Sequence, residues 1–260
     1  MKSFLLILFF YFILEGLCLA ETSTHFQEKK IPHRILFVGN SYLFYNDGVS
    51  NHVERMADEM FPESAHLFQY KSATISGANL GHHNLDFLLD AKNLGLKDQF
   101  DLVIIQGHSA ASLSEESRQQ FYYQAGLKIE KIRASGGEAA LYMTPAYVEP
   151  HVLYNPEMLN LIQDTYMKSG EQHQALVIPV GVAFKRAYEA RPELTLHKKF
   201  DGTHPDLLGT YLAACVVFAS VFNITPVGLN YDYFGAIAKS DRIFLQKIAK
   251  ETFDSFASHK

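Results

Sequence analysis

The sequence has 260 residues, of which 48% are hydrophobic and 20% are charged. This length and composition exclude an intrinsically disordered chain and leave room for one large folded domain, or two smaller ones. The formal net charge is -5, and acidic and basic residues are interspersed without a basic stripe, so nucleic acid is not expected as a partner.

The N-terminus is typical of a secretory signal peptide over residues 1–20. Lys2 precedes an unbroken apolar run at residues 4–14, and Cys18 and Ala20 occupy the −3 and −1 positions of a cleavage site after Ala20. This run is too short to cross a bilayer, which needs about 20 apolar residues. We therefore expect a secreted or periplasmic protein without a stable membrane span after cleavage. The alternative is an uncleaved N-terminal anchor.

Cleavage would leave Cys215 as the single cysteine, so no intramolecular disulfide is expected. Cys215 lies in the apolar run 211–222, which predicts a buried and unreactive thiol. The triplet Asn223-Ile224-Thr225 matches a glycan acceptor pattern, which matters only in a host that glycosylates proteins.

After a polar leader at residues 21–32, residues 33–260 are predicted to form one domain, because no Pro/Gly-rich linker divides them. Short apolar strands alternate with longer amphipathic helices, which predicts crossover connections and an α/β fold with a parallel sheet covered on both faces. Reactive groups of such sheets gather beyond the C-terminal ends of the strands. In chain order, the expected strands are 34–38, 66–70, 101–105, 139–143 and 175–179, and the expected helices are 49–61, 114–135, 155–172, 182–189, 206–222 and 240–255.

The loop after the first strand contains Gly39-Asn40-Ser41. Gly39 allows a sharp turn that would leave Ser41 exposed. A serine hydroxyl is a poor nucleophile until a base removes its proton. Taken alone this motif is weak evidence, because a loop serine is usually a cap or turn residue.

A candidate base lies in Asp201-Gly202-Thr203-His204, just before the apolar helix at 206–222. A catalytic imidazole must reach the nucleophile while a carboxylate holds its other nitrogen. Gly202 permits a bend that folds Asp201 back onto the ring of His204. The alternative is that both are polar loop residues, and that Asp206 caps the helix.

Two further loops could bind the oxyanion of a tetrahedral intermediate. Gln106-Gly107-His108-Ser109 follows the third strand, and Ser76-Gly77-Ala78-Asn79 follows the second. A side-chain amide and a bare glycine N–H are suitable donors. Either loop considered singly is also consistent with an ordinary turn.

These four motifs, in this order, resemble the blocks of the SGNH/GDSL hydrolase superfamily, and they span residues 35 to about 218. The serine motif has Asn40 where the name-giving block has Asp, and Gly77 resembles the glycine block. The Asp-x-x-His motif matches closely, including the Gly209 and Ala213 that follow. The third motif differs from the usual Gly-x-Asn-Asp. It is more similar to the Gln-Gly-Glu-Ser of the carbohydrate acetylesterase and sialate O-acetylesterase branch.

The resemblance implies a three-layer α/β/α sandwich with a flavodoxin-like, parallel, five-stranded sheet. It further implies a serine esterase that cleaves O-acetyl or short acyl esters through an acyl-enzyme, without metal or other cofactor. The expected partner is a small-molecule, glycan or lipid ester, and no oligomeric state is predicted. A lysophospholipase or thioesterase acting on lipid acyl groups is one alternative. A non-catalytic carbohydrate-binding protein on the same fold is another.

The resemblance also assigns roles to individual residues. The side-chain oxyanion donor is expected to be Gln106, with His108 and Ser109 as alternatives. Apart from the resemblance, the aromatic rings of Tyr42, Phe44 and Tyr45 beside Ser41 could stack on a sugar, line an acyl pocket or simply pack. The expected triad is Ser41, His204 and Asp201; the expected oxyanion donors are Ser41, Gly77 and Gln106; and the candidate substrate contacts are Tyr42, Asn79, His108 and Ser109.

A metal protein is a rival class, because His82, His83 and His108 are potential ligands. The chain lacks both His-Glu-x-x-His and paired Cys-x-x-Cys motifs. We therefore expect no metal site, and we expect His82 and His83 to cap a turn or face solvent.

Overall fold

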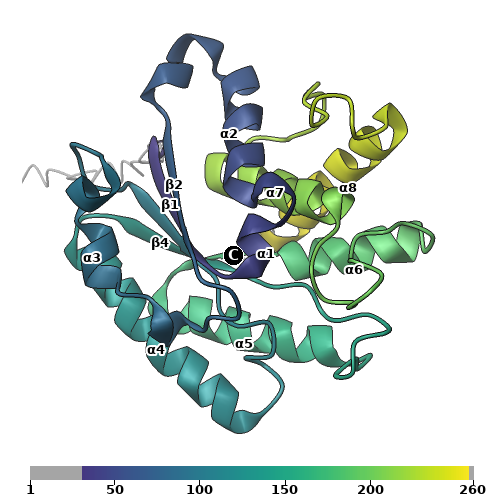
Figure 1. Cartoon of the computed structure of the whole chain (residues 1–260), viewed down its shortest axis with the longest axis horizontal. Helices are drawn as coiled ribbons and strands as arrows, with labels where there is room; N and C mark the ends of the chain where they lie inside the picture. The colour runs from purple at the N-terminus through teal and green to yellow at the C-terminus, as the bar shows by residue number, and fades with distance from the viewer. Residues whose placement is uncertain (1–30, 258–260) are drawn as a thin grey trace, which may run out of the picture. The chain divides into compact units, whose positions relative to one another are not determined.

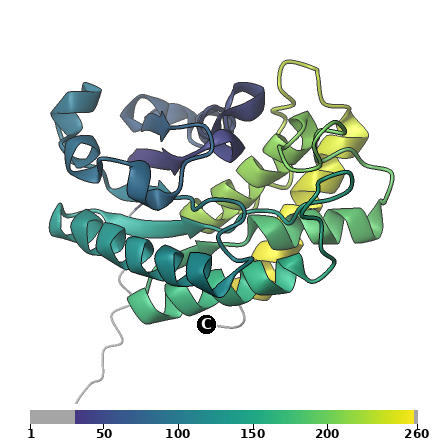
Figure 2. The same ribbon diagram turned by 60° about the horizontal axis from the view of Figure 1, so that its bottom comes forward.

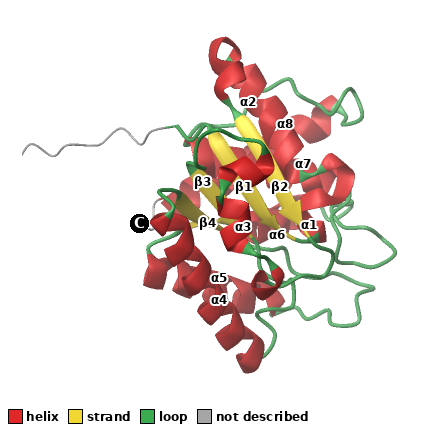
Figure 3. Ribbon diagram, turned by 60° about the vertical axis from the view of Figure 1, so that its left-hand side comes forward, coloured by secondary structure: helices red, strands yellow, loops and turns green. Residues whose placement is uncertain are grey.

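The computed structural model describes residues 31–257, which belong to one compact unit. The predicted signal peptide at residues 1–20 lies outside the described residues. Five parallel strands form one sheet in the order β2-β1-β3-β4-β5 (Figure 3), which is the flavodoxin-like order. The strands are β1 (Arg34–Gly39), β2 (Gln69–Thr74), β3 (Leu102–Ile105), β4 (Glu138–Tyr142) and β5 (Leu176–Ile178).

Helices cover both faces of the sheet and make the predicted three layers (Figure 1). One face carries α2 (Val49–Met60), α6 (Val180–Ala190), α7 (Leu207–Phe222) and α8 (Lys239–Ala257). The other face carries α3 (Leu85–Leu89), α4 (Glu115–Ala134) and α5 (Met158–His173), and α4 and α5 come forward in Figure 2.

The strands are apolar throughout because both of their faces are buried. Successive side chains of a strand point to opposite faces. Ile35 and Phe37 of β1 accordingly pack in the core beneath α7, whereas Leu36 and Val38 pack in the core beneath α4. The uninterrupted run of the first strand therefore contributes to two separate hydrophobic cores.

Helix α7 is buried on every side, because it lies between the sheet and its neighbours α2, α6 and α8. This position explains why its sequence is apolar without a polar face. Cys215 in this helix is fully buried, as predicted, and burial raises the pKa of its thiol. Among residues 31–257, no helix is both long and apolar enough to cross a bilayer.

Most predicted elements agree with the structure to within two residues at each end, and the starts of two elements were wrong. The second strand begins at Gln69 instead of His66, because Pro62 starts a 3-10 helix over Pro62–Leu67. The helix predicted from Asn155 begins at Met158, with Glu157 as its N-cap. The short helices α1 (Ser41–Phe44) and α3 have too few residues for a hydrophobic period to reveal them.

Candidate active site

The predicted site residues gather at the C-terminal edge of the sheet, next to β1 and β3. The chain leaves β1 into α1, whose first residue is Ser41, and it leaves β3 directly into Gln106. The strand order reverses between β1 and β3. Such switch points are where open α/β sheets form their ligand-binding crevices.

Ser41, His204 and Asp201 form a continuous hydrogen-bonded chain. Ser41 Oγ lies 2.8 Å from His204 Nε2, and Asp201 Oδ2 lies 2.7 Å from His204 Nδ1. The carboxylate can only accept, so Nδ1 carries the ring proton and Nε2 is left to accept from the serine hydroxyl. Two loops separated by 163 positions are therefore brought together in the arrangement by which an imidazole takes a proton from a hydroxyl.

The Asp201 carboxylate is fixed by its own loop. Its other oxygen, Oδ1, accepts from the backbone N–H groups of Thr203 at 2.9 Å and His204 at 3.0 Å. Burial alone would raise the pKa of Asp201, but these N–H groups and His204 outweigh burial, and the pKa is lowered. Gly202 makes the bend with a φ of +66°, and a side chain there would collide with the carbonyl of Val148. The carboxylate is thus held charged and oriented towards the ring.

Asn40 connects the serine turn to both neighbouring loops. Its backbone N–H donates to Gln106 Oε1 at 2.9 Å, and its side-chain Nδ2 donates to the carbonyl of Ala78 at 3.0 Å. Its Oδ1 accepts from the N–H of Tyr42 at 3.2 Å and so caps α1. One buried amide therefore fixes the positions of three loops relative to Ser41.

Gln106 does not lie where an oxyanion donor was expected. Its side chain is fully buried, with Oε1 on the Asn40 N–H and Nε2 on the carbonyl of Gly107. A Cβ on Gly39 would lie 2.5 Å from Oε1, so the glycine makes room for this amide. Both ends of the amide are engaged with backbone, and Gln106 supports the serine turn from below.

His108 has the free donor that Gln106 lacks. Its Nδ1 accepts from the N–H of Ala110 at 3.1 Å, which places the ring proton on Nε2. Burial, with a smaller contribution from His82, lowers the pKa of His108, so the ring is neutral at neutral pH. Among the described residues Nε2 has no hydrogen-bond partner.

Tyr42 and Ser109 were expected to contact substrate, but both belong to a buried cluster of hydroxyl groups. Tyr42 is 2% exposed, and its hydroxyl lies 2.5 Å from Thr203 Oγ1. Ser109 is 8% exposed, and its Oγ lies 2.7 Å from the hydroxyl of Tyr147. These contacts connect the serine turn, the loop after β3, the loop after β4 and the loop of His204.

The two aromatic residues after Tyr42 lie on the outer side of the site. The ring of Tyr45 stacks on the imidazole of His204, and the ring of Phe44 stacks on Tyr45. Phe44 is 40% exposed. Of the two rings, Phe44 is therefore the one left to meet a ligand.

The glycine loop lies beside the serine turn through the Ala78 contact with Asn40. Gly77 is exposed, has a φ of +66°, and its N–H has no hydrogen-bond partner among the described residues. Asn79 caps the 3-10 helix Leu80–His82 through Oδ1, which accepts from Gly81 N at 2.9 Å. Asn79 Nδ2 remains available to a ligand.

The histidine pair behaves only partly as predicted. His82 completes the capping box of Asn79 and is exposed, whereas His83 is 5% exposed and does not face solvent. Within residues 31–257, no three His, Cys, Asp or Glu side chains gather as metal ligands would.

Sequence reasoning missed three residues that build the site: Asn40, Thr203 and Tyr147. Asn40 had a readable signal, because asparagine before a short helix is a preferred N-cap. Thr203 and Tyr147 had none. Their contacts join loops far apart in the sequence, and a hydroxyl at such a position is typical of any loop.

The fold has counterparts among solved structures. A DUF4886 family protein from Bacteroides uniformis is 18% identical, with 84% of this chain and 93% of that chain covered and a TM-score of 0.67. A candidate SGNH hydrolase from Slackia heliotrinireducens is 20% identical, with 72% and 97% covered and a TM-score of 0.59. An acetyl xylan esterase is 14% identical, with 72% and 98% covered and a TM-score of 0.57.

No protein-family model matches the sequence, and no curated protein matches it either. The structural likeness, together with the five-stranded parallel sheet, shows that the chain has the three-layer SGNH hydrolase fold. At these identities the likeness extends to the fold alone.

Proposed function

We propose that this chain is a serine esterase that hydrolyses O-acetyl or short acyl esters through an acyl-enzyme. The observation that carries the proposal is the chain of contacts from Ser41 Oγ through His204 to Asp201, at 2.8 and 2.7 Å. A carboxylate that orients an imidazole onto a serine hydroxyl serves proton transfer during catalysis, and binding alone does not require this arrangement. Two of the structural neighbours are an acetyl xylan esterase and an acetyl-xylooligosaccharide esterase, which agrees with acetyl substrates.

The proposed reaction begins when Ser41 Oγ attacks the ester carbonyl carbon and its proton passes to His204 Nε2. Asp201 stabilises the imidazolium that forms. When the tetrahedral intermediate collapses, the ester C–O bond breaks and His204 returns the proton to the leaving alcohol oxygen. Water, deprotonated by His204, then attacks the acyl-enzyme and frees Ser41.

The oxyanion is proposed to bind the backbone N–H groups of Ser41 and Gly77. The side-chain donor is proposed to be His108, in place of Gln106, because its Nε2–H is unpartnered among the described residues whereas the amide of Gln106 is occupied. One such donor typically lowers the barrier by about 3 kcal/mol. Gln106 then acts indirectly, by holding the N–H of Asn40 and with it the serine turn.

The proposal is tested by hydrolysis of p-nitrophenyl acetate by the wild type and by Ser41→Ala. Ser41 is 7% exposed, more buried than the sequence predicted, and the variant removes a single hydroxyl group. It should keep the circular dichroism spectrum and unfolding midpoint of the wild type. We expect turnover to be lost. A folded Ser41→Ala protein that still hydrolyses the ester would rule out the assignment.

A lipid acyl hydrolase is a second candidate, favoured by apolar side chains exposed near the site. Phe200, next to Asp201, is 73% exposed, and Val152 is 93% exposed on a loop whose Val148 N–H donates to the carbonyl of Gly202 at 2.9 Å. A series of p-nitrophenyl esters separates the candidates. The proposed function predicts that kcat/KM falls from acetate to decanoate, and a lipid hydrolase predicts that it rises.

Export is proposed from the sequence of residues 1–20. The prediction is that the mature protein recovered from the periplasm or culture medium begins at Glu21. N-terminal sequencing of that protein tests it, and a protein retained in the cytoplasm with Met1 intact would contradict it.

A further inference from the structure

A pocket of about 360 Å³ lies between the loop after β2, the loop after β3 and helix α4. Gly77 and His108, which are proposed to bind the oxyanion together with Ser41, both line it. Both of their loops are hydrogen-bonded to Asn40. The loop of Gly77 accepts from it through the carbonyl of Ala78, and the loop of His108 through Gln106 Oε1. This volume is about that of twelve water molecules in the liquid. It is far larger than an acetyl group, which has two carbon atoms. The pocket therefore has room for another part of the substrate.

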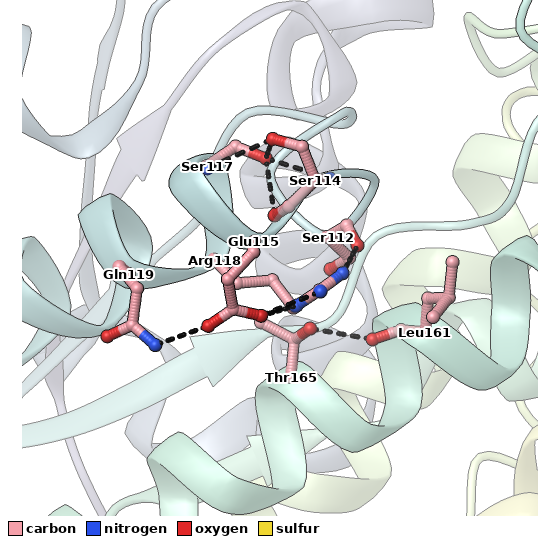
Figure 4. Close-up of polar contacts among 8 residues, drawn as sticks. All are labelled: Ser112, Ser114, Glu115, Ser117, Arg118, Gln119, Leu161 and Thr165. Carbon is pink, nitrogen blue, oxygen red and sulfur yellow. Dashed lines mark hydrogen bonds and ion pairs between the residues drawn. The ribbon is translucent and has the colours of Figure 1, made fainter.

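One face of α4 forms a wall of the pocket. Ser117, Gln120, Phe121 and Gln124 line the pocket at the spacing of one helical face. Contacts within the protein fix the start of this helix (Figure 4). The Ser114 side chain accepts from Ser117 N at 3.1 Å, and Arg118 donates to the carbonyl of Ser112 at 2.8 Å. The wall is thus positioned without a ligand.

Three polar groups of the pocket, besides His108, have no partner among the described residues. They are the side-chain amides of Gln120 and Gln124 and Asn79 Nδ2. Amides offer both donors and acceptors, as hydroxyl groups require. Phe121 and Ala111, which are 4% and 8% exposed, add apolar surface to the pocket. This combination suits a ring that has hydroxyl groups on its edge and C–H groups on its face.

The pocket is uncharged. None of its lining residues is Asp, Glu, Lys or Arg, and His108 is neutral because burial lowers its pKa. A carboxylate placed there would lose water without gaining a cation, which is costly. An anionic ring is therefore disfavoured relative to a neutral ring of the same size.

We propose that this pocket binds a neutral, hydroxyl-rich sugar ring of the substrate and discriminates against anionic sugars. The assignment rests on the proposed esterase function, because it places the sugar beside Ser41. It divides the acetylated carbohydrates into two classes, neutral glycosides that fit and uronic or sialic acids that do not.

The test measures binding to the full chain carrying Ser41→Ala, so that no turnover is needed. Methyl β-glucopyranoside and methyl β-glucuronide differ only at C6, which is a hydroxymethyl group in the first and a carboxylate in the second. Both are titrated to millimolar concentrations by NMR. We expect saturable binding of the neutral glycoside and at least tenfold weaker binding of the glucuronide. Adding Gln124→Leu should weaken binding of the neutral glycoside by about tenfold, because one hydrogen bond is lost.

Gln119→Leu is the matched control. Gln119 lies on the same helix but outside the pocket, where its amide donates to Glu115 Oε1 at 2.6 Å (Figure 4). This variant should bind the glycoside as the parent protein does. Equal affinity for the two sugars, or no effect of Gln124→Leu, would overturn the proposal.

The failure of each proposal has a distinct signature. If the wild type hydrolyses p-nitrophenyl acetate but the neutral sugar does not bind, the pocket assignment is wrong and the esterase stands. If the sugar binds at Gln124 and the ester is not hydrolysed, the esterase assignment is wrong and the pocket stands.

Discussion

The aromatic ring of Tyr45 lies over the imidazole of His204, with ring centroids 4.5 Å apart and ring planes inclined by 18°. In the proposed reaction this imidazole becomes a cation each time it takes the proton of Ser41. The face of an aromatic ring attracts a cation. Tyr45 is therefore placed to stabilise the imidazolium from the side that Asp201 does not reach.

Replacing Tyr45 tests this role. Tyr45→Leu should lower kcat for p-nitrophenyl acetate by about fivefold, because a partly exposed cation–π contact contributes about 1 kcal/mol. Tyr45→Phe keeps the ring and should keep kcat. Phe44→Leu is the control for kcat, since Phe44 stacks on Tyr45 and not on His204. Any effect of its exposed ring on ligand binding is expected in KM. Equal kcat values for Tyr45→Leu and the wild type would contradict the role.

The contact between Tyr42 and Thr203 should couple the serine turn to the histidine loop. Tyr42→Phe is expected to lower the free energy of unfolding by about 1 kcal/mol, the usual contribution of one hydrogen bond. Thr203→Val should have a similar effect, and the double variant should lose little more than either single one. Urea denaturation measures all four proteins. Strictly additive losses would show that the two hydroxyl groups do not act together.

His108 is the proposed side-chain donor to the oxyanion. His108→Ala should lower kcat for p-nitrophenyl acetate by about 100-fold with little change in KM, because the donor acts on charge that appears only in the transition state. Ser109→Ala is the neighbouring control, since its hydroxyl is turned to Tyr147, and its kcat should change far less. An unchanged kcat for His108→Ala would assign the oxyanion to other groups.

Asp101 should make stability depend on pH in the acid range. Burial would raise its pKa, but hydrogen bonds from the Arg34 side chain at 2.6 Å and from the N–H groups of Arg34 and His33 lower it. The unfolded chain therefore binds the proton more readily. The Asp101 carboxylate therefore makes its full contribution to the free energy of unfolding above about pH 4, the ordinary carboxyl pKa. This contribution is lost as the pH falls through the lower pKa of the folded state.

Asp101→Asn should accordingly reduce the loss of unfolding free energy between pH 6 and pH 3. Asp98→Asn is the control, because Asp98 is 74% exposed and lies 3.3 Å from Arg34. Urea denaturation at the two pH values measures both variants. If Asp101→Asn and the wild type lose equal stability on acidification, the carboxylate has no such role.

The layered fold was predictable because its signals are local. Most strands are short apolar runs and most long helices are amphipathic. Helix α7 was predictable because it is apolar on every side and has no charged residue. The strand at Gln69–Thr74 was placed too early. It lies at the edge of the sheet, where its half-buried side chains give a weak pattern.

The site was predictable in its residues more than in its contacts. Ser41, Asp201 and His204 were found because their motifs have fixed spacings, and the structure places them in hydrogen-bond contact. The environments of Gln106 and Tyr42 were not predictable. Whether an amide or a phenol faces a ligand or the interior depends on loops that meet only after folding.

The central claim is that His204 makes the hydroxyl of Ser41 nucleophilic, and covalent labelling tests it most directly. The folded wild type is incubated with a fluorophosphonate probe, and the modified residue is identified by mass spectrometry. We predict a single adduct on Ser41, absent in Ser41→Ala and formed far more slowly in His204→Asn. A folded wild type that remains unlabelled, or carries its adduct on another residue, would contradict the account.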